Sequence, residues 1–183
     1  MEIHTSRLVL RAAREADIEP LHAILSDRNA MAYWSSPPHR DIGQTRDWLG
    51  SMIAIQPSEG EDFVVEHRGR VIGKAGLWRF PEIGFIFHPD HWGRGFATEA
   101  LTSVLDRAFQ VHGLPKVDAD VDPRNGSSLK LLQRLGFRET GRKERTWHVG
   151  DEWCDSVYLE LEPHAWTSRM GKEGRRFPAD PHP

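Results

Sequence analysis

A glycine-rich turn offers the clearest chemistry in the sequence, and it reads Gly93-Arg94-Gly95-Phe96-Ala97-Thr98. It follows a β-rich run and precedes a helical stripe of apolar residues, so we expect it to open a helix. The first turn of a helix has backbone N–H groups without internal partners, and the helix dipole adds partial positive charge there. Glycines let an anion approach this backbone closely, and Arg94 can add a charge-assisted contact. The turn is therefore predicted to bind a phosphate group.

Two familiar phosphate-binding motifs do not account for this turn. The P-loop needs Lys followed by Ser or Thr after its second glycine, whereas Phe96 and Ala97 follow Gly95 here. The dinucleotide motif needs three spaced glycines, which the turn lacks. An ordinary glycine turn before a helix is the alternative interpretation.

The elements that must position the turn alternate between strands and helices. Their order predicts an α/β fold, with one mixed sheet of about seven strands flanked by four helices in a single domain. Residues 1–162 form that domain, and residues 163–183 are expected to form a polar, flexible C-terminal tail. The expected elements are a strand at 2–12, a helix at 14–27, a loop at 33–39, a helix at 41–56, a hairpin at 62–67 and 70–80, a strand at 82–88, a helix at 96–112, a strand at 116–121, a helix at 125–135 and strands at 138–148 and 153–162.

Composition limits the class of protein. The chain has 183 residues, 38% of them hydrophobic and 28% charged, which is typical of one globular domain. The net charge of −3 predicts no general attraction to nucleic acid or to an anionic membrane. No apolar run is long enough to span a bilayer, and a lone cysteine, Cys154, fits a reducing cytoplasm.

Further motifs accompany the glycine turn at a characteristic spacing. Asn125-Gly126-Ser127-Ser128 lies about thirty residues downstream, and Leu131-Leu132-Gln133-Arg134-Leu135-Gly136-Phe137 follows it. Thr5-Ser6-Arg7-Leu8-Val9-Leu10-Arg11 stands near the start, and Asp155-Ser156-Val157-Tyr158-Leu159-Glu160-Leu161 near the end. Together these motifs resemble the Gcn5-related N-acetyltransferase (GNAT) superfamily, and they look closest to its RimJ/RimL-like branch.

This resemblance implies an enzyme that uses acetyl-CoA as a co-substrate and needs no metal. The acetyl group would pass from the thioester to a primary amine by direct attack, and the acceptor would be a small molecule or a peptide or protein N-terminus. In the superfamily the strands matching 82–88 and 116–121 splay apart, with acetyl-CoA in the gap and its diphosphate on the glycine turn. The alternative from another class is a catalytically silent module that binds or senses acyl-CoA.

The resemblance also assigns residues to the co-substrate. The backbone of Phe85, Ile86 and Phe87 is expected to hydrogen-bond the pantetheine arm as an extra strand would. Asn125 is a good helix N-cap and would also touch this arm, and Ser128 would hydrogen-bond or protonate the departing thiolate. Leu132 stands where many members carry a tyrosine acid, so the resemblance leaves the proton donor open.

Two carboxylates are candidates for the general base that takes the ammonium proton. Asp120 matches in position a glutamate base of a related branch, and Glu82 matches a glutamate usual in the RimJ/RimL-like group. Asp118, Asp120 and Asp122 also alternate with apolar residues, as they would on a half-solvated strand, so neither carboxylate has to be the base.

Aromatic residues in loops and strands are candidates to bind the acceptor amine. Aromatic walls suit an apolar, cationic or peptide-like amine, although core packing is the competing use of such residues. A metal site at His88, Asp90 and His91 is not expected, because these residues lead into the glycine turn and a metal ion would compete with the phosphates for that position. Dimers are common in the superfamily, and the sequence leaves a homodimer open. The acceptor candidates are Tyr33, Trp34, Trp78 and Trp147, with His39, His148 and Trp153 as further aromatic neighbours.

Overall fold

Eight strands form one mixed sheet in the structure, a computed structural model that describes residues 2–174. The strands lie side by side in the order β1-β2-β3-β4-β5-β6-β8-β7. The elements are β1 (Glu2–His4), β2 (Leu8–Arg11), the 3-10 helix η1 (Glu15–Asp17), α1 (Ile18–Leu25), α2 (Ile42–Ile53), β3 (Glu61–His67), β4 (Arg70–Arg79), β5 (Glu82–Phe87), the 3-10 helix η2 (Pro89–His91), α3 (Phe96–Gln110), β6 (Val117–Val121), α4 (Gly126–Arg134), β7 (Arg138–Val149), β8 (Glu152–Leu161) and α5 (Pro163–Gly174).

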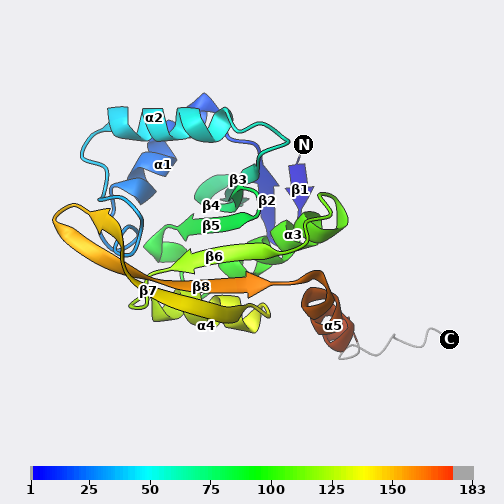
Figure 1. Ribbon diagram of the computed structural model, residues 1–183. Coiled ribbons are helices and arrows are strands. Elements are labelled where there is room, and N and C mark those ends of the chain that lie inside the picture. The colour runs from blue at the N-terminus through cyan, green and yellow to red at the C-terminus, as the bar shows by residue number, and fades with distance from the viewer. Residues whose placement is uncertain (1, 175–183) are drawn as a thin grey trace.

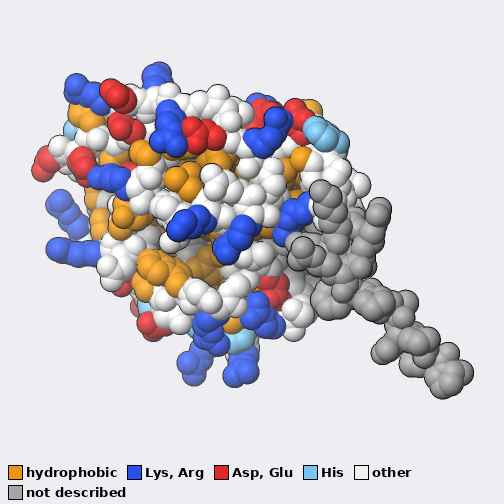
Figure 2. Space-filling view, turned by 90° about the horizontal axis from the view of Figure 1, so that it is seen from below, with side chains coloured by type: hydrophobic (Ala, Val, Ile, Leu, Met, Phe, Trp, Pro, Cys, Tyr) orange, Lys and Arg blue, Asp and Glu red, His pale blue; other side chains and the backbone are white. Residues whose placement is uncertain are grey.

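Helices cover both faces of the sheet, as the predicted α/β fold requires. Helices α1 and α2 lie over one face, and α3 and α4 lie over the other (Figure 1). Successive strand residues point to opposite faces, so Ile86 packs with α1 and α2 whereas Phe87 packs in the cluster that contains α3. Seen from below, the surface carries Lys and Arg side chains among hydrophobic ones (Figure 2).

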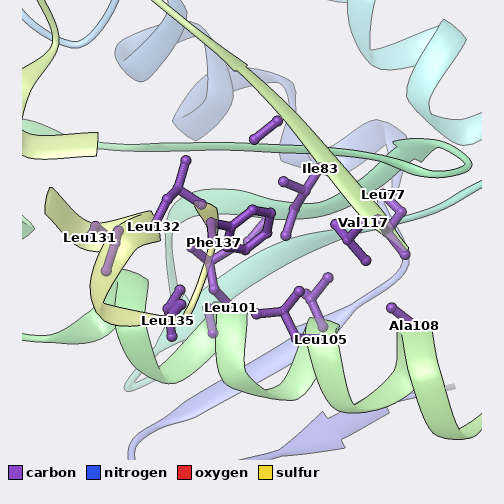
Figure 3. Packing of buried hydrophobic residues seen from close by; sticks show 14 of the residues in the cluster. Leu77, Ile83, Leu101, Leu105, Ala108, Val117, Leu131, Leu132, Leu135 and Phe137 are labelled. Atoms are coloured by element: carbon purple, nitrogen blue, oxygen red, sulfur yellow. The ribbon is translucent and has the colours of Figure 1, made fainter. Parts of the chain in front are cut away.

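The larger core lies between the sheet and helices α3 and α4. Phe137 directly follows α4 and its turn, and leucines of both helices surround its ring (Figure 3). Each fully buried leucine in such a core contributes about 2 kcal/mol of transfer free energy. The leucines labelled there are Leu101 and Leu105 of α3, Leu131 and Leu132 of α4, and Leu135 just after it.

The sheet has one more strand than the sequence predicts, because residues 2–12 do not form a single strand. β1 and β2 pair antiparallel, with Glu2 opposite Arg11, so the chain reverses between them. The Thr5 N–H donates to the Leu8 carbonyl over 2.9 Å, and the Leu8 N–H donates back to the Thr5 hydroxyl over 2.9 Å. The turn has no glycine or proline, so the sequence carries no strong turn signal at that point.

Residues 163–174 form helix α5, where the sequence predicts the start of a flexible tail. Trp166 is only 2% exposed, and its indole N–H donates to an Asp106 carboxylate oxygen of α3 over 2.8 Å. The structure therefore differs from the prediction here, because one buried tryptophan anchors a segment whose composition is mostly polar. Residues 175–183 of the predicted tail lie outside the described residues, and the domain boundary at 162 stays a prediction.

Strands β5 and β6 separate almost as soon as they meet. They are parallel neighbours, and the register joins them at a single pair, Glu82 opposite Asp118. Beyond it, β6 pairs along its whole length with β8, while β5 pairs with β4. Within residues 2–174, the edge of β5 that faces β6 is therefore left without a neighbouring strand after its first residue, as the expected splay requires.

A buried charge cluster ties η1 to the sheet and predicts how stability depends on pH. Arg11 donates to both carboxylate oxygens of Asp17, over 2.8 and 2.7 Å, and both side chains are about 5% exposed. Burial alone would raise the pKa of Asp17, but hydrogen bonds from Arg11 and the Arg14 N–H outweigh it and hold the pKa below its usual value. A carboxylate with a lowered native pKa stabilises the fold at neutral pH, and this contribution is lost as pH falls through that pKa.

We expect Asp17→Asn to lower the free energy of unfolding by about 2 kcal/mol at pH 7, because the buried Arg11 guanidinium loses one of its two carboxylate partners and keeps the other, Glu66. The deficit should shrink as pH falls below about 4, because the carboxyl of the unfolded wild type takes up a proton there, whereas that of the native protein stays ionised to lower pH. Urea unfolding of both proteins between pH 7 and pH 3 measures this. Asp47→Asn, at an exposed position of α2, is the matched control. A deficit that stays constant over this range would contradict the pH dependence.

Candidate active site

The glycine turn presents free backbone donors at the start of α3. None of the six N–H groups from Gly93 to Thr98 has a hydrogen-bond partner within residues 2–174. Gly93 and Gly95 both have positive φ, +69° and +78°, which glycine adopts without steric cost. Gly93, Arg94 and Gly95 are exposed, so an anion can reach these donors. The predicted phosphate cradle (Gly93–Thr98) is thus a group of unsatisfied donors, and its binding of a phosphate stays a prediction.

Glu99 of α3 fixes the cradle to the turn between β1 and β2. One of its carboxylate oxygens accepts hydrogen bonds from the Thr5 hydroxyl (2.6 Å), the Ser6 hydroxyl (3.0 Å) and the Arg7 N–H (2.8 Å). Arg7 Nε donates to the other oxygen over 2.6 Å, and a second Arg7 nitrogen donates to the Arg94 carbonyl over 2.9 Å. Apart from the presence of Arg7 in an N-terminal motif, no local pattern of residues predicts this contact.

Two guanidinium groups supply the positive charge near the cradle. Arg7 and Arg94 lie over the Phe96 ring, 4.7 and 4.9 Å from its centre, and the His67 ring lies 4.6 Å from it. Loss of solvation, together with neighbouring arginines, holds the pKa of His67 and that of His91 below the usual value. The histidines are therefore mostly neutral at pH 7, and the arginines carry the charge that suits a phosphate.

The backbone predicted to hold the pantetheine arm lies at the open edge of β5. Phe85, Ile86 and Phe87 pair with β4 on one side, and no strand of the described part of the chain pairs with them on the other. The Phe87 carbonyl already accepts a hydrogen bond from the Trp92 indole over 2.8 Å. Any arm bound here would therefore use donors and acceptors of β5 nearer its start, and the contact itself stays a prediction.

Asn125 caps α4 as the sequence predicts. Its side-chain oxygen accepts a hydrogen bond from the Ser128 N–H over 3.1 Å. Ser128 is half-buried, and its hydroxyl does not line the pocket described next. Leu132 is fully buried in the core, so its position cannot supply an acid. The contacts of Asn125 and Ser128 with a co-substrate stay predictions.

A cavity of about 540 Å³ lies on the sheet face that α1 and α2 cover, at the level where β5 and β6 part. It brings together both candidate bases and all four aromatic residues predicted to bind the acceptor. The cavity is large enough for a small organic molecule. The lining includes Glu82, Asp120, Tyr33, Trp34, Trp78 and Trp147, together with Trp48, Asp62, Lys74, Gly84, Asp122, Arg124, Glu152, Cys154 and Asp155.

Both candidate bases hold a hydrogen bond at the cavity. An Asp120 oxygen accepts from the Trp147 indole N–H over 2.9 Å, and a Glu82 oxygen accepts from Arg79. Strand alternation explains how Asp120 arrives there, because Ala119 and Val121 are buried on the opposite face. The geometry places both carboxylates at the same cavity and does not separate their roles.

Sequence reasoning missed the polar floor of this cavity. Lys74 and Asp62 form an ion pair of 2.8 Å between β4 and β3, and each side chain is 3% exposed. Arg124 bridges Asp122 and Glu152 at the other end. The alternation of residues along β3 was one hint that Asp62 is buried, because Asp62 points to the same face of the sheet as the buried Val64.

Two features are absent from residues 2–174 of the structure. No group of three or more histidine, cysteine or carboxylate side chains is arranged to hold a metal ion. No helix in this range is both long enough and apolar enough to cross a membrane.

Known proteins are similar to this chain in sequence and in fold. Residues 7–138 match the acetyltransferase (GNAT) domain family. A Bacillus licheniformis protein named N-acetyltransferase p20 is 33% identical over 149 residues, which cover 76% of this chain and 83% of that protein. Spermidine N(1)-acetyltransferase of Vibrio cholerae is 27% identical over 171 residues, covering 90% and 98%.

A solved structure agrees with these sequence matches. Spermidine N-acetyltransferase from Vibrio cholerae in complex with CoA and spermine has a TM-score of 0.76 and 25% identity, covering 89% of this chain and 99% of that one. These relatives establish the superfamily and leave the RimJ/RimL-like branch a prediction. The structure is consistent with the matched family. It has an eight-stranded sheet with an open β5 edge, and it has free donors at the start of α3. This chain belongs to the GNAT acetyltransferase family.

Proposed function

We propose that the protein is an acetyl-CoA-dependent N-acetyltransferase whose acceptor is the primary amine of a small cationic molecule. The observation that carries this proposal is the cavity itself, which joins two candidate bases and a set of aromatic walls beside the open edge of β5. A relative solved with CoA and spermine, and others named spermidine acetyltransferases, support an amine of this class.

The charges of the cavity favour a cation. Six carboxylates line it, against the cations Lys74 and Arg124, and both cations are already paired. Glu82, Asp120 and Asp155 remain outside these two pairs. Aromatic faces attract a cation through their negative quadrupole, and five aromatic side chains line the same space.

The chain's own residues suffice for direct attack. The cradle binds the diphosphate of the co-substrate through its N–H groups, and the edge of β5 orients the arm toward the cavity. Glu82 or Asp120 takes the proton of the acceptor ammonium, directly or through water, so that the neutral amine attacks the thioester carbonyl carbon. The carbon–sulfur bond then breaks, the bonded nitrogen loses its second proton to solvent, and the thiolate takes a proton from solvent or from Ser128, which solvent then reprotonates.

A panel of amines tests the proposed function. With saturating acetyl-CoA, we expect thiol release to be fastest for aliphatic diamines and polyamines, slower for monoamines, and slowest for amines that carry a carboxylate. The acidic aromatic cavity binds the first group best, and an anionic group would be repelled there. Tight binding of acetyl-CoA with no thiol release from any amine would instead support the silent acyl-CoA-binding module. A cytoplasmic location and a homodimer remain predictions that this assay does not address.

A further inference from the structure

The ion pair on the cavity floor is not explained by stability. Lys74 and Asp62 are each 3% exposed, and the neighbouring side chains Val64 and Ile86 on the same face are apolar. Replacing such a buried pair by apolar residues of similar size is often neutral or stabilising, because desolvating two charges costs several kcal/mol. One Asp62 oxygen, Oδ1, is buried without a hydrogen-bond partner among the described residues. Burial accordingly raises the pKa of Asp62 in spite of the Lys74 charge.

The ammonium of Lys74 lies against the start of β5. Its Nζ is 3.3 Å from the point where a Cβ of Gly84 would stand, and 5.6 Å from the centre of the Trp34 ring. Trp78 Cδ1 is equally close to that point, and Lys74, Gly84 and Trp78 all line the cavity, so the ammonium borders the cavity where β5 carries no side chain. An ammonium has three N–H donors, and the described residues give Lys74 one acceptor, Asp62. Two donors are left for a ligand in the cavity.

The direction in which the co-substrate lies along β5 determines which of its atoms is next to the Lys74 ammonium. The cradle follows the end of β5, so an arm anchored in the cradle runs along the open edge from Phe87 back toward Phe85. The thioester at the far end of the arm comes next to Gly84. This step rests on the proposed function, and it brings the thioester carbonyl to the place where Lys74 has spare donors.

We propose that Lys74 is a catalytic residue, which donates a hydrogen bond to the thioester carbonyl oxygen and stabilises the negative charge that develops on it. When the amine nitrogen bonds to the carbonyl carbon, the electron pair of the C=O bond moves to that oxygen. It returns as the carbon–sulfur bond breaks, and the proton that the bonded nitrogen then loses passes to solvent, because the carboxylate base already holds the proton of the ammonium. Lys74 keeps its proton throughout, and Asp62 positions it. A fixed charge at this point acts more strongly on the transition state than on the bound substrate.

Two variants separate the effect of the Lys74 charge on catalysis from its effect on folding. Asp62→Leu/Lys74→Met removes both charges together and leaves no orphaned ion, in a face that is already apolar. Asp62→Asn removes the counter-charge of Lys74 but keeps an oxygen that can accept its hydrogen bond, so it tests the positioning role of Asp62. Lys143→Met, at an exposed position of β7, controls for the loss of a lysine elsewhere. Urea unfolding of each variant checks that the fold is kept.

The first readout needs no acceptor amine. Acetyl-CoA labelled with ¹³C at the carbonyl, bound to the whole protein, gives a carbonyl band in the difference infrared spectrum. We expect the ammonium to polarise this bond, so that the band lies at lower frequency in wild type, in Asp62→Asn and in Lys143→Met than in the double variant. An equal band position in wild type and in the double variant would overturn the role of Lys74, whatever the amine panel shows.

The second readout is turnover with the best amine of the panel. We expect kcat to fall about 100-fold in the double variant with little change in KM for the amine, the scale of losing one oxyanion donor. Asp62→Asn should lose less than about 10-fold. A rise in KM for the amine at unchanged kcat would assign Lys74 to the acceptor instead, and so would contradict the proposal. A shifted band without thiol release from any amine would contradict the proposed transferase function and keep the carbonyl contact.

Discussion

Gly95→Glu is expected to lower the affinity for CoA more than about 100-fold, whereas Gly95→Gln lowers it far less. Each lost charge-assisted hydrogen bond to the diphosphate costs about 2 kcal/mol, and a factor of 100 corresponds to about 2.7 kcal/mol. The new carboxylate would stand at the N-cap of α3, where the free N–H groups and Arg94 attract it. It would occupy the cradle and repel the diphosphate.

Glutamine is the matched control because it has the size of glutamate without its charge. Both variants place a side chain at a backbone with φ of +78°, so both carry the same conformational strain. Among the described residues, a nitrogen of the flexible Arg7 side chain is the one atom within 4 Å of the added Cβ, at 3.3 Å, so neither variant crowds the core. Isothermal titration with CoA gives the affinities, and thermal unfolding without ligand compares the folds. Equal affinities for the two variants would mean that strain, and not charge, governs binding at the turn.

Local signals in the sequence predicted the parts of the site that depend on local geometry. Gly93 and Gly95 need positive φ, and the Asn125 cap needs only the next helical turn. The turn between β3 and β4 at Arg68 and Gly69 has both residues at positive φ, as a two-residue hairpin turn prefers. Such features involve a few neighbouring residues, so composition and spacing are sufficient to predict them.

Features that depend on distant contacts could not be predicted in the same way. Trp166 is buried because α3 offers it a partner 60 residues away. Glu99 holds the N-terminal turn through bonds that cross more than 90 residues of sequence. The Lys74 and Asp62 pair lies within a run that otherwise reads as an apolar strand face. The local sequence around these residues does not predict which distant residue each of them contacts.

The base is expected to be identified by a second pair of substitutions, Glu82→Gln and Asp120→Asn. Removing the true base should lower kcat by about 100- to 1,000-fold and abolish the acidic limb of the pH–rate profile, because general base catalysis contributes about 10²–10⁴-fold. Removing the other carboxylate should leave that limb in place. The amide substitutions keep the size of each side chain and an oxygen that can still accept from Trp147 or Arg79.

Each candidate also has its own hydrogen-bond donor, which allows a milder test of the same assignment. Trp147→Phe removes the N–H donor to Asp120 and keeps an aromatic wall, whereas Arg79→Met removes the cation that pairs with Glu82. Losing a donor disfavours the carboxylate form, so the acidic limb should move to higher pH only in the variant that affects the true base. If Asp120 is the base, Trp147→Phe shifts the limb and Arg79→Met does not; if Glu82 is the base, the reverse holds. A limb that moves in neither variant, and that survives both amide substitutions, would exclude the two carboxylates and leave deprotonation of the amine to solvent.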